Sequence, residues 1–459
     1  MFRFIHSADI HLDSPLKGLE RYEGAPVDEL RGATRRALEN LVALAIESDV
    51  DFVLIAGDLY DGDWKDYNTP LYFASQMRRL QDASIPVYLI AGNHDAANKM
   101  TRSLRLPANV RMLSHDAPET ALIESLGVAI HGQSFASAEV SADLSAAYPA
   151  ARKDFFNIGL LHTSAAGYAQ HARYAPCSIE GLRSKEYDYW ALGHIHQQEI
   201  LHPLRPMVAF AGNVQGRHIR ETGPKGCLLV TVDDRGQPSV EQKSLDVLRW
   251  ELCRVDASGL EHPDDVLAAF TQSLANLRRR HGELPLAVRV EVHGASPIHE
   301  RLAADPRKWT NHLRAAAIEA EGRDVWLEKV LLNTTAPSLC EPLAGDGPLG
   351  ELLDYLEHLQ SDDDALSRLA ETLADLRRKL PAELADRVLG TQRPQAASEI
   401  LPLRHATSAD NAPLSAANRL REILGEVEPL LVGRLSAGNP TAPVAALSPS
   451  ESAPAPART

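Results

Sequence analysis

The first half of the chain contains four long apolar runs, each rich in β-branched residues or leucine. From the N-terminus they are FRFIHSAD, VDFVLIAGD, PVYLIAGNHD and YDYWALGHIH. Runs of this kind are typical of strands covered on both faces, so they predict buried strands. Amphipathic stretches alternate with them, for example over residues 34–47, and predict helices. Through about residue 245 the pattern therefore predicts an α/β domain with four layers in the order α-β-β-α.

The apolar pattern changes near Leu248 and again near Gly350. Strand patterns RWELCRV, LAVRVEVHG and DVWLEKVLLN, with a helical stretch over 263–280, predict a small α+β module. After Gly350 leucines recur at helical spacing, which predicts two or three amphipathic helices; these leucines are Leu352, Leu353, Leu356, Leu359, Leu366, Leu369, Leu373 and Leu376. The end of the chain is rich in proline, alanine and serine and predicts disorder. We therefore expect four parts, which cover residues 1–245, 246–336, 337–435 and 436–459.

Each strand run of the first half ends in aspartate, asparagine or histidine. The polar endings are D-x-H, GD, GNHD and GHIH, and a further run, IGLLHTS, holds the lone His162. Sheets of α/β domains bind ligands at the carboxyl ends of their strands, so we expect these groups to converge. Alternation within a strand would place Asp9 and His11 on one side. Carboxylate, imidazole and amide oxygen are the ligands that two adjacent divalent ions need, so the sequence predicts a binuclear metal site.

Each of these pieces also has an ordinary structural explanation. A D-x-H at a strand end is commonly a capping aspartate beside a satisfied histidine, Gly-Asp is usually a turn, and His162 alone would suit a core edge. GNHD and GHIH are more specific. Three contiguous polar residues after a buried strand have no packing role, and H-x-H is a common metal-ligand spacing. The order and context of all five together favour the metal site.

Composition narrows the class of protein without choosing a function. The 459 residues are 44% hydrophobic and 24% charged, ordinary values for a globular protein of about three domains. No apolar run is long enough for a membrane span and no secretory signal is visible, so we expect a soluble, cytoplasmic protein. Four cysteines without C-x-x-C pairing predict reduced, buried thiols: Cys177, Cys227, Cys253 and Cys340. A net charge of −15 counts against a broad nucleic-acid-coating face, although bound cations would make one site locally positive.

In their order, D-x-H, GD, GNHD, a lone histidine and GHIH resemble the calcineurin-like metallophosphoesterase superfamily over about the first 215 residues. Within it, GDLYDGDWKDYNT and FAGNVQGRHIRETGPKG resemble the SbcD-type DNA repair nucleases, in their YhaO branch. The resemblance implies that His94 is the catalytic histidine and that Asp95 orients its imidazole. It also implies a first ion held by Asp9, His11, Asp58 and His196, and a second held by Asp58, Asn93, His162 and His194.

The resemblance implies hydrolysis of a phosphoester by a two-metal hydroxide mechanism. Two ions roughly 4 Å apart acidify a bridging water and neutralise the attacking and leaving oxygens of an in-line displacement. His94 would stabilise the pentavalent phosphorus or protonate the departing oxygen. A ligand set without cysteine suits manganese, iron or zinc, and the resemblance favours manganese.

DNA is the substrate that the resemblance implies, cut by an exonuclease or endonuclease acting in repair. Basic side chains after GHIH would position a nucleic-acid backbone, and a solvated charged loop is the equal alternative; they are Arg205, Arg217, His218, Arg220 and Lys225. Trp64, Tyr67 and Tyr72 follow the bridging aspartate and would either stack on bases or, more commonly, pack a helix against the sheet.

The rest of the chain points to partners. By position, residues 246–336 resemble a capping domain, and the C-terminal helices lie where such nucleases dock a coiled-coil ATPase subunit. Each helix could equally pack on its own protein, and a second copy of the chain is a further candidate partner. Two other functions stay open: a small-molecule or phosphoprotein phosphoesterase, which would not need the long extension, and a noncatalytic adaptor for the ATPase. An intact pair of His94 and Asp95 counts against the adaptor.

Overall fold

The computed structural model of this chain describes residues 1–14, 16, 32–61, 68–97, 106–165, 174–322, 324–337, 348–362, 365–366, 368 and 424. The chain forms two compact units. The first unit contains Met1–Asp256, Asp264–His293 and Asp305–Asn333, and it includes every residue of the predicted metal site that the sequence singled out. The second contains Ala257–Pro263, Gly294–Ala304 and the described part of Thr334–Thr459.

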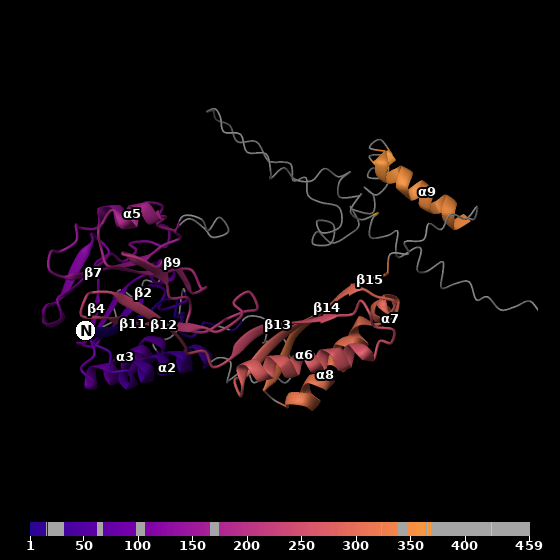
Figure 1. Cartoon of the computed structure of the whole chain (residues 1–459), viewed down its shortest axis with the longest axis horizontal. Helices are drawn as coiled ribbons and strands as arrows, with labels where there is room; N and C mark the ends of the chain where they lie inside the picture. The colour runs from indigo at the N-terminus through magenta and orange to yellow at the C-terminus, as the bar shows by residue number, and fades with distance from the viewer. Residues whose placement is uncertain are drawn as a thin grey trace, which may run out of the picture. The chain divides into compact units, whose positions relative to one another are not determined.

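Two six-stranded sheets build the N-terminal part of the first unit (Figure 1). In the first sheet the neighbouring strands β1, β2, β3 and β4 are parallel, and β11 pairs antiparallel with β1. The carboxyl ends of β1, β2 and β3 therefore share one sheet edge. In sheet order the strands are β12 (Pro238–Ser244), β11 (Gly226–Val232), β1 (Phe2–Ser7), β2 (Phe52–Ala56), β3 (Val87–Ile90) and β4 (Val110–Met112).

In the second sheet the neighbours β6, β7, β8 and β10 are parallel, while β5 and β9 pair antiparallel at its two edges. In this sheet too, the parallel strands bring their carboxyl ends to one edge. Its strands, in sheet order, are β5 (Glu119–Ile123), β6 (Val128–Gly132), β7 (Phe156–His162), β8 (Tyr189–Gly193), β10 (Met207–Phe210) and β9 (Glu199–His202).

Side-chain alternation along the strands fills the space between the two sheets and covers their outer faces. In β1, Phe4 enters the cluster shared by both sheets, while its neighbour Ile5 enters the cluster beneath the helices. The Phe4 ring stacks on Phe52 at 4.9 Å between centroids and meets Tyr189 of the other sheet edge-on at 5.4 Å. Aromatic rings thus join the two sheets at their centre.

Helices cover the outer faces. Helices α2 (Ala33–Glu47) and α3 (Asn68–Asp82) place buried apolar residues against the first sheet, and α5 (Ile179–Arg183) with the 3-10 turn η3 (Leu144–Ala147) does so on the second. Their apolar stripes recur at helical spacing, which is why these segments are helices. The order α-β-β-α confirms the predicted layered α/β core.

The strand patterns that begin at Arg249 form a separate three-stranded sheet. It consists of β13 (Arg249–Asp256), β14 (Leu286–Ala295) and β15 (Val325–Thr335), and β13 runs parallel to β14. Helices α6 (Asp265–His281) and α8 (Pro306–Glu321) pack on each other, and α6 also packs on β13. The predicted helix over 263–280 is therefore present, with a start two residues later.

The short helix α7 (His299–Ala304) lies between β14 and α8 in the chain, and α9 (Pro348–Ser361) follows β15. The predicted leucines from Leu369 onward lie outside the described residues, as do Cys340, most of 337–435 and the whole tail 436–459. The described cysteines, Cys177, Cys227 and Cys253, are buried free thiols, as expected. No helix among the described residues has both the length and the apolar character that crossing a membrane requires.

Candidate metal centre

The polar residues that end the strand runs converge at the carboxyl edges of both sheets. Asp9 and His11 follow β1, Asp58 follows β2, Asn93 begins the short helix α4 (Asn93–Ala97) after β3, and His162 is the last residue of β7. His194 and His196 follow β8. Three overlapping groups of potential ligands result, each with its ligand atoms within 4.8 Å of one another: Asp9, His11 and His196; His11, Asp58 and His94; and Asp58, His162 and His194.

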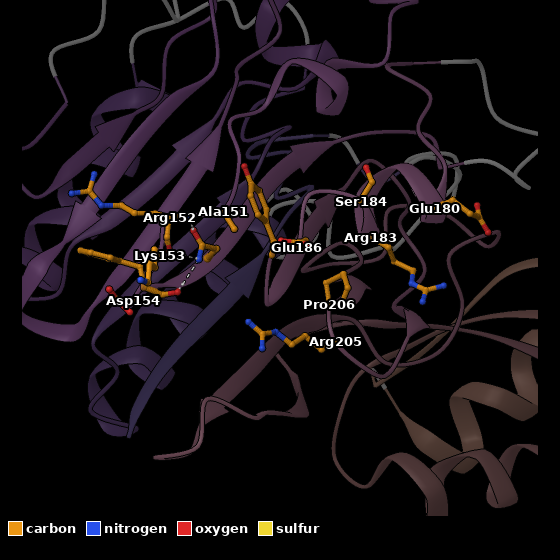
Figure 2. Close-up of a pocket in the computed structure, with 13 residues that line it drawn as sticks. Ala151, Arg152, Lys153, Asp154, Glu180, Arg183, Ser184, Glu186, Arg205 and Pro206 are labelled. Carbon is orange, nitrogen blue, oxygen red and sulfur yellow. Dashed lines mark hydrogen bonds between the residues drawn. The ribbon is translucent and has the colours of Figure 1, made fainter.

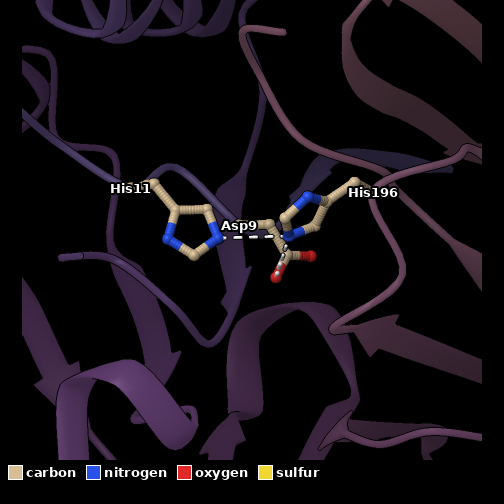
Figure 3. Close-up of side chains that lie close together, drawn as sticks. All are labelled: Asp9, His11 and His196. Carbon is tan, nitrogen blue, oxygen red and sulfur yellow. Dashed lines mark hydrogen bonds and ion pairs between the residues drawn. The ribbon is translucent and has the colours of Figure 1, made fainter. Parts of the chain in front are cut away.

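Asp9, His11 and His196 form the first group (Figure 3). His11 Nε2 lies 3.2 Å from His196 Nε2, and His196 Nε2 lies 3.8 Å from Asp9 Oδ1. His196 Nδ1 donates to Glu221 Oε1 at 2.7 Å, and His11 Nδ1 faces Asp61 Oδ1 at 3.6 Å. When both imidazoles carry their proton on Nδ1, the two Nε2 lone pairs face each other, an arrangement that a shared cation stabilises.

His162 and Asp58, which belong to the third group, meet in the same way with Asn93 beside them. His162 Nδ1 donates to the backbone oxygen of Ala56 at 2.9 Å, which leaves Nε2 as an acceptor. That nitrogen lies 3.0 Å from Asn93 Oδ1 and 3.5 Å from Asp58 Oδ2. With its only ring proton on Nδ1, His162 presents Nε2 as an acceptor beside Asn93 Oδ1 and Asp58 Oδ2, the arrangement expected of cation ligands, so these residues fit a divalent ion.

Asp58 belongs both to the group that contains His11 and to the group that contains His162. We call the parts of the centre around these two histidines its first and second halves. Burial alone would raise the pKa of its carboxyl, but the imidazoles of His162 and His11 outweigh burial and hold the pKa well below its usual range. Burial also opposes charge on His162, yet the Asp58 carboxylate raises the pKa of this imidazole to about 9. The pKa of His11, dominated by burial, is lowered to about 4. The centre therefore favours positive charge beside Asp58 and a neutral, ligating imidazole at His11.

Several of these residues stand on left-handed backbone. Asp9 has φ 49°, His11 46°, Asp58 51° and His194 100°. Because β1 ends at Ser7, strand alternation does not place Asp9 and His11 together, contrary to the prediction. They converge because each is turned by a positive φ, and their amides bond to the backbone oxygens of Gly57 and Asp58. Strained backbone of this kind is retained where the surrounding structure determines it, commonly at functional sites.

The glycines before the ligands serve close approach as much as turning. Gly57 has φ 91°, and a side chain there would approach His162 Nδ1 to 2.5 Å. A side chain at Gly92 would collide with the Asp58 carboxylate. Of these two glycines only Gly57 has a positive φ, so Gly92 is needed for space rather than for a turn.

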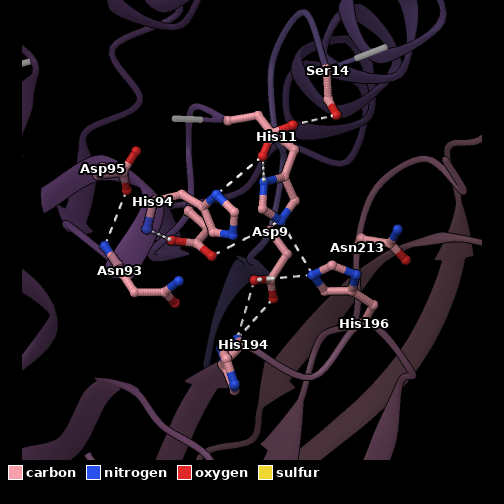
Figure 4. Close-up of polar contacts among 12 residues, drawn as sticks. Asp9, His11, Ser14, Asn93, His94, Asp95, His194, His196 and Asn213 are labelled. Atoms are coloured by element: carbon pink, nitrogen blue, oxygen red, sulfur yellow. Dashed lines mark hydrogen bonds and ion pairs between the residues drawn. The ribbon is translucent and has the colours of Figure 1, made fainter. Parts of the chain in front are cut away.

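The carboxylate beside the His94 imidazole is Asp61; two of its partners, His94 and Ser14, are labelled in Figure 4. Asp61 Oδ1 lies 3.1 Å from His94 Nδ1, and Ser14 Oγ donates to Asp61 Oδ2 at 2.7 Å. The hydrogen bond that His94 donates to Asp61 raises the pKa of His94, although burial opposes this. Burial would raise the pKa of Asp61, but hydrogen bonds from His11 and His94 lower it. Asp61 therefore stays ionised and favours the protonated imidazole.

Asp95 has a different role from the predicted one. Its buried carboxylate accepts hydrogen bonds from the backbone amides of Leu59, Tyr60 and Gly92 at 2.9 to 3.1 Å. Burial, with a contribution from the charge of Asp58, raises its pKa to about 7. Asp95 thus holds the two ligand-bearing loops together. Its contacts are those of a turn carboxylate that binds backbone amides.

The basic residues after GHIH separate into two places. Arg217 reaches the centre: its guanidinium lies 3.3 Å from Ser14 Oγ, 3.5 Å from Asp61 Oδ1 and 3.6 Å from Glu221 Oε1. His218 Nε2 lies 3.4 Å from Glu221 Oε1, and Arg220 is exposed. Of the three predicted substrate residues, only Arg217 points at the ligand cluster with its charged end.

Arg205 and Lys225 are not available for a substrate at the centre. Arg205 pairs with Asp188 at 2.7 Å and lines a cleft beside the amino ends of β7 and β8, the strand ends opposite to the ligands (Figure 2). Lys225 is buried and donates to the backbone oxygen of His196 at 3.0 Å. Tyr72 donates to Glu39 at 2.6 Å and packs beneath the helices, whereas Trp64 and Tyr67 lie outside the described residues.

Sequence reasoning missed Asp61 and Glu221. A signal for Asp61 was available, because GDLYD places it three residues after Asp58, within one turn of the same loop. For Glu221 there was none: it lies in the segment HIRET, where a charged side chain usually faces water, and only folding brings it to His196.

Comparison with known proteins gives two family matches. Residues 2–198 match the calcineurin-like phosphoesterase family, and residues 250–335 match the family described as "Metallophosphoesterase YhaO, middle domain". The chain is 32% identical over 371 residues to the "Uncharacterized metallophosphoesterase YhaO" of Bacillus subtilis (strain 168), which covers 78% of this chain and 90% of the relative.

More distant similarity extends to proteins named "DNA double-strand break repair protein Mre11". The relative from Aeropyrum pernix is 25% identical over 402 residues, which is 82% of this chain and 92% of the relative. The relative from Thermoplasma acidophilum is 24% identical over 309 residues, which is 63% of this chain and 76% of the relative.

Proposed function

This chain belongs to the YhaO-type metallophosphoesterases of the calcineurin-like family, and we propose that it hydrolyses phosphodiester bonds of DNA with two divalent metal ions, manganese being our first choice. The observation that carries the proposal is the shared position of Asp58 between two convergent sets of acceptors, with the His94 imidazole at their margin. When bound, the two ions supply Lewis acidity, an activated water and charge neutralisation.

We assign the first ion to Asp9, His11, Asp58 and His196, and the second to Asp58, Asn93, His162 and His194. The chain's own residues then bind the substrate and move the proton. His94, with a side chain 40% exposed, can reach a substrate, and Asp61 keeps its imidazole protonated. His94 therefore donates its proton to the departing oxygen. Arg217 binds a non-bridging phosphate oxygen, because its guanidinium stands beside the centre and can form paired hydrogen bonds.

The choice of DNA rests on the length of the similarity. A core of two sheets suffices for phosphoester chemistry, whereas the relatives named as DNA repair proteins resemble this chain well beyond that core. A small phosphoester would leave the sheet of β13, β14 and β15 without a part in substrate choice. The same reasoning makes a coiled-coil ATPase our candidate partner at the C-terminal helices, in the cytoplasm.

Purified protein incubated with manganese and end-labelled DNA tests the proposal. We expect cleavage that chelation abolishes and that His94→Ala reduces by about 100-fold, the lower end of the contribution of a general acid. Thr310→Ala, at a half-buried site on α8, is the matched control and should cleave normally. Absence of cleavage by the wild type, or full activity of His94→Ala, would refute the proposal.

A substrate comparison separates DNA from small phosphoesters. If the enzyme acts on DNA, duplex DNA should be turned over faster at equal phosphodiester concentration than bis-nitrophenyl phosphate. A reversed ratio, with both activities lost in His94→Ala, would keep the chemistry and replace the substrate.

A further inference from the structure

A segment buried at both ends, residues 213–221, connects the metal centre to the start of the three-stranded sheet. On one side it touches His196, whose backbone oxygen accepts from the Asn213 amide at 3.4 Å. On the other it touches residues 247–250, which lead into β13. Within this segment Asn213, Gln215 and Glu221 are buried polar side chains, so their hydrogen bonds determine how the segment is held.

On the metal side, the segment fixes the direction of one histidine. Glu221 Oε1 accepts from His196 Nδ1 at 2.7 Å. The other oxygen, Glu221 Oε2, accepts from Asn213 Nδ2 at 3.0 Å and from the backbone amide of Arg217 at 2.7 Å. The carboxylate is therefore held at both oxygens, and its position decides where His196 Nε2 points. The labelled Asn213 and His196 lie on the same side of the cluster in Figure 4.

On the sheet side, two side chains clamp the middle of the segment. Trp250 is fully buried, and its Nε1 donates to the backbone oxygen of Gly216 at 3.0 Å. Gln215 Nε2 donates to the backbone oxygen of Leu248 at 2.7 Å, and Gln215 Oε1 accepts from the Val247 amide at 2.9 Å. Gly216 directly precedes Arg217, whose amide holds Glu221. The clamp and the carboxylate are thus adjacent in the chain.

We propose that Trp250 and Gln215 are positioning residues for the first metal ion: by holding residues 215–217 against the start of β13, they keep Glu221 in place and so aim His196. The proposal rests on the metal centre of the proposed function, but not on its choice of DNA. It makes the start of β13 part of the machinery that sets metal affinity. A ligand or partner that shifts this strand would alter binding of one ion and spare the other.

Calorimetric titration with manganese is the direct test, because it counts ions and reads affinity without substrate. We expect the wild type to bind two ions. Trp250→Phe keeps the aromatic packing and loses the donor to Gly216; it should weaken one of the two ions by about threefold to tenfold, less than the 10- to 100-fold typical of a direct partner of a ligand. The other ion should bind as in the wild type.

Trp190→Phe is the matched control. Trp190 is also fully buried and donates Nε1 to a backbone oxygen, that of Leu182 at 3.2 Å, on the outer face of the second sheet. Both variants should lower the melting temperature by similar amounts, but only Trp250→Phe should change metal affinity. Equal metal affinity in the two variants would overturn the proposal.

A double-mutant cycle identifies the route. If Trp250 acts through Glu221, then Trp250→Phe should have no further effect on metal affinity in a Glu221→Gln background, whereas additive effects would contradict the route. Gln215→Met, which keeps the volume and removes both hydrogen bonds to 247–248, should reproduce Trp250→Phe. A wild type that binds fewer than two ions would overturn the metal centre and this inference together; one that binds two ions but leaves DNA intact would overturn only the substrate.

Discussion

The two halves of the centre are built by different means. Around the first group, His196 is held by Glu221, His11 faces Asp61, and Arg217 adds a cation, all of them charged side chains on loops. In the second half, His162 ends strand β7 and is oriented by the backbone oxygen of Ala56. One half is therefore tuned by side chains that single substitutions can remove, and the other by the sheets themselves.

The two halves should differ in how they respond to substitutions. A backbone carbonyl cannot be lost by substitution, so the second half should fail only when a ligand is changed or the sheets unfold. The first half should respond in graded steps to changes outside its ligands. Removing a partner that orients a metal-binding histidine commonly costs 10- to 100-fold in affinity or activity.

Asp58→Asn should impair both halves of the centre together, because this carboxylate belongs to both. We expect activity to fall by more than about 100-fold, beyond the range for partners outside the ligand set, and metal binding to drop below two ions. Calorimetry and a phosphodiesterase assay measure both quantities. Two ions bound with wild-type affinity would show that Asp58 does not bridge. Asp154→Asn, an exposed carboxylate change, is the control.

Asp61→Asn should affect the proton rather than the metals. Without the charge of Asp61 the protonated form of His94 loses its main support, so we expect kcat to fall by about 10- to 100-fold. KM and the two-ion stoichiometry should stay close to wild type, and steady-state kinetics with calorimetry check this division. A fall confined to metal binding would assign Asp61 to His11 instead.

Glu221→Gln, which hardly changes the size of the side chain, should weaken metal binding in the first half only. The amide keeps the shape of the side chain but no longer holds the His196 imidazole as a carboxylate does, so one ion should bind about tenfold more weakly. The second ion should be unaffected. Equal weakening of both ions would show that the two halves are not independent, and this outcome can be read from the same titration.

His6 tests the sheets on which the second half depends. It is fully buried, with Nδ1 3.0 Å from Tyr189 Oη and Nε2 3.1 Å from the backbone oxygen of Leu192, and burial lowers its pKa to about 3 from 6.5. Between those values the unfolded chain binds the extra proton, so stability should fall as pH falls from 6.5 towards 3. This residue contributes at most about 1.4 kcal/mol per pH unit.

Denaturation of the chelated protein at a series of pH values measures the slope. His6→Gln should flatten it by up to one proton. An unchanged slope would show that His6 is protonated without cost in the folded state.

The ligands at strand ends were predictable from the sequence, because a polar residue directly after a buried strand must lie at the edge of the sheet. Asp58, Asn93 and His162 needed only the order of strands and the rule that ligands gather at carboxyl edges. The layered core was predictable from the same runs, because a sheet whose strands are buried on both faces needs other elements packed on each face.

What the sequence could not supply is the conformation of the loops. Asp61 and Asp95 have the same side chain, and only the path of the loops decides which of them meets His94. Glu221 reaches His196 across 25 residues of chain. Such contacts depend on backbone dihedrals and packing that apolar patterning does not encode.

The left-handed backbone at Asp9 and Asp58 restricts which amino acids can occupy these two positions. Aspartate and asparagine tolerate that conformation better than other residues with a side chain, because their short polar groups bond locally. Glutamate offers the same oxygen donor but lacks this tolerance, and glycine offers the tolerance without the donor. Backbone conformation and metal chemistry together therefore leave aspartate as nearly the only residue that suits these two positions.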